Sequence, residues 1–257
     1  MNQGLSLRLS RVASLVGMRN CVADLGSDHA GLPIALVRQG QVNAAIAVEV
    51  VEGPLSASRH QVKDAALETR IDCRLGNGFA PIHRGEIDAV TIAGMGGKTM
   101  YAILTAAHAL PHIAQNGFRV VLQPMDSAGT LRYLAKQLGW TMRADVRMVD
   151  RGVSYTCLSY DVGDNALCDE ADVQEKLLRL PPFETLPVDE RMTYVLGEVP
   201  LRSGCRLAHE ALEQEIDERE RILLALNRGG TEDARARRAL IEAERAALRA
   251  LRERYFS

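Results

Sequence analysis

The chain has 257 residues, of which 47% are hydrophobic and 25% are charged. This is the composition of a soluble globular protein with room for one sizeable α/β domain and a smaller appendage. The 5 cysteines form no Cys-x-x-Cys pair, which argues against a zinc cluster or a disulfide framework and favours a cytoplasmic location. We find no apolar run of membrane-spanning length and no signal-peptide pattern. A formal net charge of -2 excludes recognition of nucleic acid by overall charge, so any such contact requires a local patch.

Short apolar runs alternate with helix-like stretches through the first two thirds of the chain. The apolar runs, each ending in a glycine or a polar turn, are 21–26, 44–49, 71–76, 89–94 and 119–124. The helix-like stretches between them are 30–40, 54–67, 97–109 and 127–138. This alternation predicts right-handed βαβ units and a mostly parallel sheet. The runs are apolar on both faces, as expected for strands that are covered by helices on each side.

Two further strand-like segments, 146–149 and 154–162, flank the turn-forming link Asp150-Arg151-Gly152. They predict an antiparallel hairpin that closes one edge of the sheet. Five parallel strands followed by such a hairpin match the class I Rossmann-like methyltransferase topology better than a plain dinucleotide-binding fold.

The character of the sequence changes near Gly163. Four prolines in 163–200 predict an irregular connection with room for short helices. Two charged stretches follow, in which apolar residues recur about every three or four positions. These residues are Leu212, Ile216, Leu223 and Leu226 in the first stretch, and Ile241, Leu248, Leu251 and Tyr255 in the second. Gly229 and Gly230 suit a helix end and Thr231 suits the next N-cap, so we expect an antiparallel, coiled-coil-like helical hairpin. The predicted domains are a catalytic domain, 1–162, and a linker with the helical hairpin, 163–257.

The turn after the first apolar run is the first candidate for a ligand site. Ligands of open α/β sheets bind at the carboxyl ends of strands where the strand order reverses, which we expect at this strand. Gly26 permits a tight turn, but Ser27, Asp28 and His29 follow it, so the Gly-x-Gly-x-x-Gly fingerprint is absent. Asp28 would repel a phosphate and suits a cofactor that carries a cationic ammonium, such as S-adenosylmethionine. The alternative is an ordinary strand-to-helix turn.

Two further positions at strand ends fit the same ligand. Glu49 ends the second run, where a carboxylate is expected to accept hydrogen bonds from ribose hydroxyls, although a surface acid is an equally simple interpretation. Asn77 and Gly78 follow the third run and could contact an adenine edge, and a plain Asn-Gly turn fits them equally well.

The segment Gly94-Met95-Gly96-Gly97 follows the fourth run and is poor material for a helix or a strand. It permits close approach of the backbone to a ligand, with Met95 as a soft apolar contact. The alternative is a flexible loop. Gln123 closes the fifth run at the same end of the sheet, and its amide can both donate and accept hydrogen bonds, as a base-reading residue must.

Together these motifs resemble one family over about the first 160 residues. The sequence resembles the bacterial tRNA (adenine-22-N1)-methyltransferases, the TrmK family. The matching stretches are Leu5–Leu9, Ala23–Ala30, Leu32-Pro33, Glu49 with Gly53-Pro54, Arg74–Gly78, Ile92–Gly97 and Leu122–Pro124. The resemblance implies a Rossmann-like catalytic domain with a C-terminal helical, coiled-coil-like domain, S-adenosylmethionine as cofactor and tRNA as substrate.

The resemblance also assigns roles to residues. Those expected to bind the cofactor are Asp24, Gly26, Ser27, Asp28, His29, Glu49, Asn77, Gly78, Gly94, Met95, Gly96 and Gly97. The methionine end would lie at Gly26, Asp28 and His29. Glu49 would hold the ribose, Asn77 and Gly78 the adenine, and the segment from Gly94 would flank the methyl group.

The reaction implied is methyl transfer to N1 of an unpaired adenine, which has a free lone pair and therefore does not require a strong base. We assign no catalytic base. Gln123 is the candidate for contact with the exocyclic amine, and Asp126 is a weaker one. His29 could accept a proton, although a structural role at the helix start is favoured.

Arginines near the N-terminus and one lysine after the glycine segment are candidates for phosphate contacts. They are Arg8, Arg11, Arg19 and Lys98. Solvated surface charge is the alternative for all of them. His108 and His112 are separated by Pro111 and lack a partner glutamate, so we predict no metal site. Two other functions stay open: a class I methyltransferase with another acceptor, and a tRNA-binding protein without catalysis. The sequence does not fix the oligomeric state.

Overall fold

The computed structural model describes residues 4–163, 169–226 and 232–256. The chain forms two compact units, Met1–Leu180 and Pro181–Ser257. None of the helices within the described ranges is long and apolar enough to cross a membrane.

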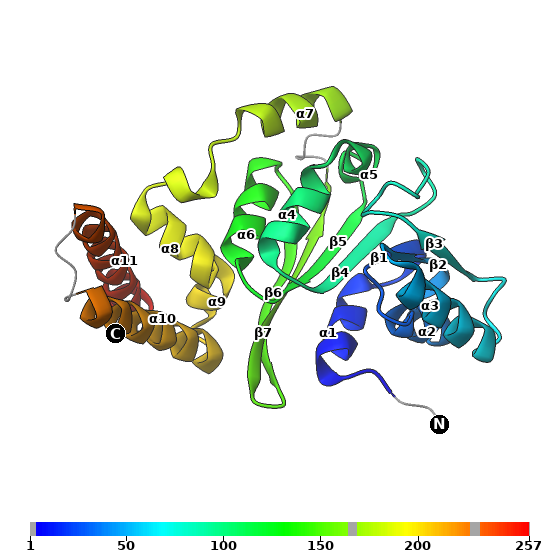
Figure 1. Cartoon of the computed structure of the whole chain (residues 1–257), viewed down its shortest axis with the longest axis horizontal. Coiled ribbons are helices and arrows are strands. Elements are labelled where there is room, and N and C mark those ends of the chain that lie inside the picture. Colours follow the sequence, from blue (N-terminus) through cyan, green and yellow to red (C-terminus); the bar gives the residue numbers. More distant parts are fainter. Residues whose placement is uncertain (1–3, 164–168, 227–231, 257) are drawn as a thin grey trace. The chain divides into compact units, whose positions relative to one another are not determined.

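A seven-stranded sheet with the order β3-β2-β1-β4-β5-β7-β6 forms the centre of the first unit (Figure 1). The strands are β1 (Arg19–Leu25), β2 (Val42–Glu49), β3 (Ile71–Leu75), β4 (Ala89–Met95), β5 (Arg119–Pro124), β6 (Thr141–Asp150) and β7 (Val153–Asp161). Strands β1 to β5 are parallel, whereas β7 pairs antiparallel with both β5 and β6. The strand order reverses at β1, which lies between β2 and β4. The predicted Rossmann-like methyltransferase sheet is confirmed.

Helices cover both faces of the sheet. On one face lie α1 (Leu7–Val16), α2 (Gly31–Arg38) and α3 (Glu52–Asp64), and on the other α4 (Gly97–Thr105), α5 (Leu110–Ile113) and α6 (Ala128–Gln137). A short 3₁₀ helix, η1 (Ala107–Ala109), links α4 to α5. Side chains of β1 alternate between the two cores: Ala23 and Leu25 pack with α4 to α6, and Val22 packs with α1 to α3. This explains why the parallel strands are apolar on both faces.

The hairpin turn between β6 and β7 consists of Arg151 and Gly152, both with left-handed backbone (φ 51° and 80°). Two left-handed residues form the tight turn whose twist matches an antiparallel hairpin. On β6 the buried Asp145 accepts two hydrogen bonds from Arg132 of α6, at 2.7 and 2.8 Å, which ties the outer strand to the helix layer.

Helix α7 (Glu170–Arg179) belongs to the first unit. Its side chain Val173 is fully buried in the core beneath α4 to α6, and Leu177 and Leu180 pack against the same core. The compact unit therefore extends to Leu180, whereas the sequence places the boundary after residue 162.

The second unit is helical. Its elements are η2 (Phe183–Thr185), α8 (Val188–Leu196), α9 (Glu198–Ser203), α10 (Arg206–Leu226) and α11 (Glu232–Phe256). The apolar stripes of α10 and α11 pack with α8 around the fully buried Leu212 and Leu248. Glu244 of α11 accepts from Arg191 of α8 at 2.6 Å and from Arg219 of α10 at 3.1 Å, which connects the three helices. The helical hairpin is as predicted, and the Gly229-Gly230-Thr231 turn lies outside the described residues.

Candidate active site

The carboxyl ends of β1 to β5 gather the predicted site segments along one edge of the sheet. Leu25 is level with Val48 of β2 and Ile92 of β4. Glu49 is level with Leu75, and Ala93 with Gln123. The turns that follow these strands are therefore neighbours, as the parallel topology requires.

The turn after β1 has an unusual backbone. Gly26 has φ 71°, and the non-glycine residues Asp28, His29 and Ala30 follow with φ 44°, 71° and 55°. Each left-handed non-glycine residue costs on the order of 1–3 kcal/mol, and such strain concentrates at binding sites. Asp28 and His29 are exposed, with 3.4 Å between the carboxylate and the ring Nε2. The Asp28 carboxylate is therefore accessible to a ligand at the point where the strand order reverses.

Asp24 and Ser27 stabilise this turn through buried hydrogen bonds. Both are buried, and the Asp24 carboxylate accepts from Ser27 Oγ at 2.7 Å and from Thr91 Oγ1 at 2.6 Å. Burial raises the pKa of Asp24 to about 6. The two residues hold the turn, and their direct contact with a cofactor stays a prediction.

Glu49 lies at the end of β2 beside the same turn. It is 6% exposed, and burial raises the pKa of its carboxyl, which accepts from the backbone N–H of Asp28 and from Ser58 Oγ at 3.5 Å. After β3, Asn77 is exposed and Gly78 is buried with φ 56°. A Cβ at Gly78 would lie 3.0 Å from Cγ2 of Ile103, so a glycine keeps this turn close to α4.

The glycine segment, Gly94–Gly97, ends β4 and begins α4, and it is tightly packed. The strand register shifts between Ala93 and Met95, and Gly94 has φ 79°. A Cβ at Gly26 would overlap Cε of Met95, so the Met95 side chain lies across the β1 turn. At Gly97 a Cβ would lie 2.6 Å from the carbonyl oxygens of both Asp126 and Ser127. This close packing contradicts the alternative interpretation of a loose surface loop.

Asp126 brings a carboxylate to this segment. Its Oδ1 accepts from the backbone N–H of Gly97 at 3.0 Å, and its Oδ2 would lie 3.3 Å from a Cβ on Gly96. The charge lies at the N-terminus of α4, where the helix dipole stabilises it. The sequence names Asp126 only as a weaker candidate for contact with the exocyclic amine, and does not predict its hydrogen bond to Gly97.

Gln123 is completely buried at the end of β5. Its Oε1 accepts a hydrogen bond from Nη1 of Arg8, and its Nε2 donates to the carbonyl oxygen of Pro124 at 3.0 Å. The predicted contact between Gln123 and the exocyclic amine stays a prediction, and both ends of the amide are engaged within the chain.

Arg8 lies beside the glycine segment. Its Nη1 would be 3.5 Å from a Cβ on Gly94, and its Cζ lies 5.7 Å from the centre of the Tyr155 ring. Tyr155 comes from β7, too far along the chain for the sequence to connect it with the site.

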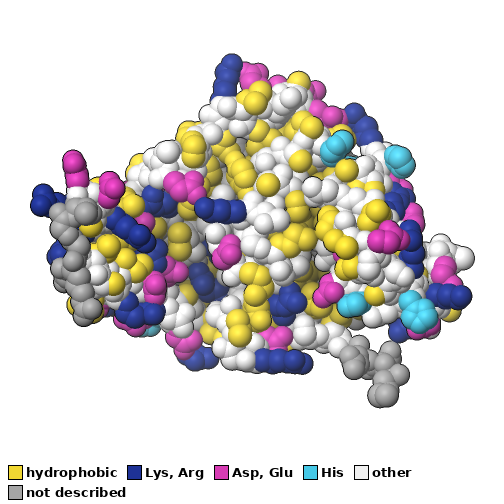
Figure 2. Space-filling model, viewed as in Figure 1, with side chains coloured by type: hydrophobic (Ala, Val, Ile, Leu, Met, Phe, Trp, Pro, Cys, Tyr) yellow, Lys and Arg dark blue, Asp and Glu magenta, His cyan; other side chains and the backbone are white. Residues whose placement is uncertain are grey.

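The other predicted phosphate contacts differ in surroundings. Arg11 and Lys98 are exposed, whereas Arg19 is half-buried and pairs with Asp161 at 3.4 Å. On the face shown in Figure 2, basic and acidic side chains are interspersed. Arg11 and Lys98 stay predictions, and the ion pair of Arg19 favours a structural role.

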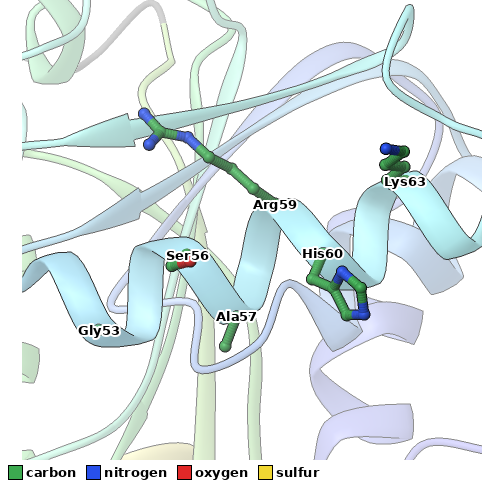
Figure 3. Close-up of a pocket in the computed structure, with 6 residues that line it drawn as sticks. All are labelled: Gly53, Ser56, Ala57, Arg59, His60 and Lys63. Carbon is green, nitrogen blue, oxygen red and sulfur yellow. The ribbon is translucent and has the colours of Figure 1, made fainter.

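Within the described ranges there is no group of three or more His, Cys, Asp or Glu side chains arranged to hold a metal. His112 is buried and stacks on Phe79, with 5.2 Å between ring centres. The shallow depression in Figure 3 lies on α3, and none of the predicted site residues lines it; its residues are Gly53, Ser56, Ala57, Arg59, His60 and Lys63.

Comparison with known proteins agrees with this geometry. A family model described as a methyltransferase domain matches residues 5–158. The tRNA (adenine(22)-N(1))-methyltransferase of Bacillus subtilis is 35% identical over 160 residues, which are 62% of this chain and 66% of that protein, just under two thirds of its length.

Solved structures match over nearly the whole chain. The crystal structure of the Bacillus subtilis M1A22 tRNA methyltransferase TrmK has a TM-score of 0.81 and 26% identity, covering 96% of this chain and 98% of that one. Sp1610 of Streptococcus pneumoniae, solved in complex with S-adenosyl-L-methionine, has a TM-score of 0.73 and 28% identity, covering 96% of this chain and 99% of that one. The family model alone covers more than half of the sequence, and the chain therefore belongs to this methyltransferase family.

Proposed function

We propose that this protein transfers a methyl group from S-adenosylmethionine to N1 of an adenine in tRNA, at the position that its Bacillus subtilis relative modifies, adenine 22. The observation that carries the proposal is the tightly packed glycine segment after β4, which lies against the strained turn after β1 at the reversal of strand order. Ligands of open α/β sheets bind at this point.

The residues at this edge fit S-adenosylmethionine better than a dinucleotide. The exposed Asp28 carboxylate suits a cationic ammonium and opposes a pyrophosphate. Glu49 would accept ribose hydroxyls, and Asn77 with Gly78 would meet the adenine. The remaining members of the proposed cofactor set are Asp24, Gly26, Ser27, His29, Gly94, Met95, Gly96 and Gly97. When bound, the cofactor supplies a methyl group on a sulfonium.

The chain's own contribution is alignment and electrostatics. N1 lies on the pairing edge of adenine, so the base must leave its stack, and the glycine segment leaves room for close approach. Alignment of reacting groups lowers a barrier by several kcal/mol, on the order of 7–11 in the most favourable cases. Methylation places positive charge on the ring, and Asp126, whose carboxylate lies beside Gly96, is suited to stabilise that charge.

The acceptor is the part that needs a direct test. Unmodified tRNA transcripts incubated with labelled S-adenosylmethionine should gain one methyl group, mapped to N1 of adenine 22 by mass spectrometry of nuclease fragments. Methylation elsewhere would favour another acceptor, and cofactor binding without methylation of any RNA would favour a binding protein without catalysis. Action on tRNA agrees with the cytoplasmic location predicted from the cysteines, which cell fractionation would test.

A further inference from the structure

One side chain of α1, Arg8, is fixed beside the glycine segment. Nη1 of Arg8 donates to the buried Oε1 of Gln123, and its backbone N–H donates to Oδ2 of Asp150 at 3.0 Å. The first turn of α1 is thereby attached both to the end of β5 and to the end of β6. An arginine held at both its backbone and its head group keeps one orientation.

An aromatic ring lies next to this guanidinium. The half-buried Tyr155 of β7 has its ring centre 5.7 Å from Cζ of Arg8, within the range of a cation–π contact. Arg8 also lies against Gly94. Because Gly94 has no Cβ, Nη1 of Arg8 lies close to the Gly94 backbone. A planar cation thus adjoins the segment that is proposed to flank the methyl group, and an aromatic ring lies next to that cation.

We propose that Arg8 and Tyr155 form a stacking platform for the adenine that is methylated, and that Gln123 is a positioning residue that acts through Arg8. The proposal rests on the proposed function and adds the residues that receive the acceptor base. RNA-binding proteins stack unpaired bases on aromatic rings and on guanidinium planes. The platform supplies the ring that the glycine segment lacks.

The surroundings of Arg8 favour a base over a phosphate as its contact. Arg11, one turn further along α1, is exposed and so is better placed for a phosphate contact. Arg8 is half-buried between an amide, a ring and the glycine segment, so it can present a flat face rather than a mobile charge.

The burial of Gln123 favours a role in orienting Arg8. Its side chain has no exposed surface, and its Nε2 is held by the Pro124 carbonyl, which fixes Oε1 toward Arg8. Gln123 therefore orients the guanidinium, and this indirect role replaces the direct contact with the exocyclic amine that the sequence suggests.

The test uses the full-length enzyme with an unmodified tRNA transcript. Arg8→Ala and Tyr155→Ala should each raise KM for tRNA about tenfold or more, since one stacked base is commonly worth that much. Affinity for S-adenosylmethionine should stay within about twofold, which also verifies folding. Tyr155→Phe keeps the ring and should therefore raise KM much less than Tyr155→Ala. Lys63→Ala is the control, because it removes a positive charge in the last turn of α3, away from the carboxyl edge.

Three readouts separate a platform from a structural or phosphate-binding role. Arg8→Lys keeps the charge but has no planar face, so it should be as impaired as Arg8→Ala. The salt dependence of KM should be unchanged in Arg8→Ala, whereas loss of a phosphate contact lowers the slope by about 1. Gln123→Leu should raise KM, and adding it to Arg8→Ala should cause no further loss.

Rescue by lysine, a reduced salt slope, or additive effects of the Arg8 and Gln123 changes would overturn the proposal. So would Arg8→Ala and Tyr155→Ala enzymes whose KM matches that of Lys63→Ala. A wild-type enzyme that does not methylate tRNA would instead contradict the proposed function.

Discussion

Replacement of Gly97 by alanine tests whether close packing of the glycine segment against the β5–α6 turn maintains the cofactor site. The added Cβ would lie 2.6 Å from the carbonyl oxygens of Asp126 and Ser127 and 2.9 Å from the carbonyl carbon of Ser127. All three atoms are backbone, so relief requires α4 and the β5–α6 turn to separate. The separation would also break the hydrogen bond from the Gly97 N–H to Asp126.

Overpacking of this kind costs on the order of 1–3 kcal/mol, and a lost hydrogen bond to a charged group costs about as much again. A combined loss of about 3 kcal/mol should lower the melting temperature of a unit of this size by about 6–12 °C. Differential scanning calorimetry measures the shift, and titration calorimetry with S-adenosylmethionine should show weaker binding.

Gly53→Ala is the matched control. Gly53 lies in the first turn of α3, and apart from its chain neighbours no described residue comes within 4 Å of an added Cβ. The benefit of alanine in a helix is opposed by the constraint from Pro54, so stability should change by less than about 1 kcal/mol. If Gly97→Ala melted at the wild-type temperature and bound the cofactor normally, the packing argument would be refuted.

Other predictions concern single carboxylates. Asp28→Ala should weaken S-adenosylmethionine binding by about tenfold or more, because a charge-assisted contact to the ammonium is lost; calorimetry that gives the wild-type affinity removes Asp28 from the site. Asp24 has a pKa of about 6 against 3.8 ordinarily, so the folded state binds its proton more tightly and stability should fall as the pH rises from about 4 to about 6. Asp24→Asn should flatten that slope in urea unfolding at a series of pH values, and an unaltered slope argues against the burial effect. Glu244→Ala would remove one carboxylate partner from Arg191, which keeps the Glu184 carbonyl, and one from Arg219, which keeps Glu215. The loss should cost about 1–3 kcal/mol, measured as faster amide exchange in α11; unchanged exchange would show that the ion network is dispensable.

The regular part of the fold could be predicted from the sequence because its signals are local. On β1, Val22 faces one core and Cys21, Ala23 and Leu25 face the other, which is typical of a strand between two helix layers. Helix α1 was not predicted as an element, since its ten residues present only Val12, Ala13 and Val16 to the core. The cap at Ser6, whose Oγ accepts from the Leu9 N–H at 3.2 Å, was a signal that could have revealed its start.

The site residues at strand ends could be predicted from the sequence. The contacts that depend on packing between distant elements could not. Glu49 ends β2 and Gly94 lies near the end of β4, so parallel topology alone brings them to one edge. The hydrogen bond of Gln123 to Arg8 could not be found, because Arg8 lies far from it in the sequence and meets it only through the packing of α1 on the sheet.

A crystal structure with S-adenosylhomocysteine tests most directly whether the carboxyl edge of the sheet is the cofactor site. The nucleoside should lie between the turn at Gly26–Asp28 and the glycine segment, with its ribose hydroxyls on Glu49. Ligand density at any other surface, with this edge empty at saturating concentration, would contradict the account.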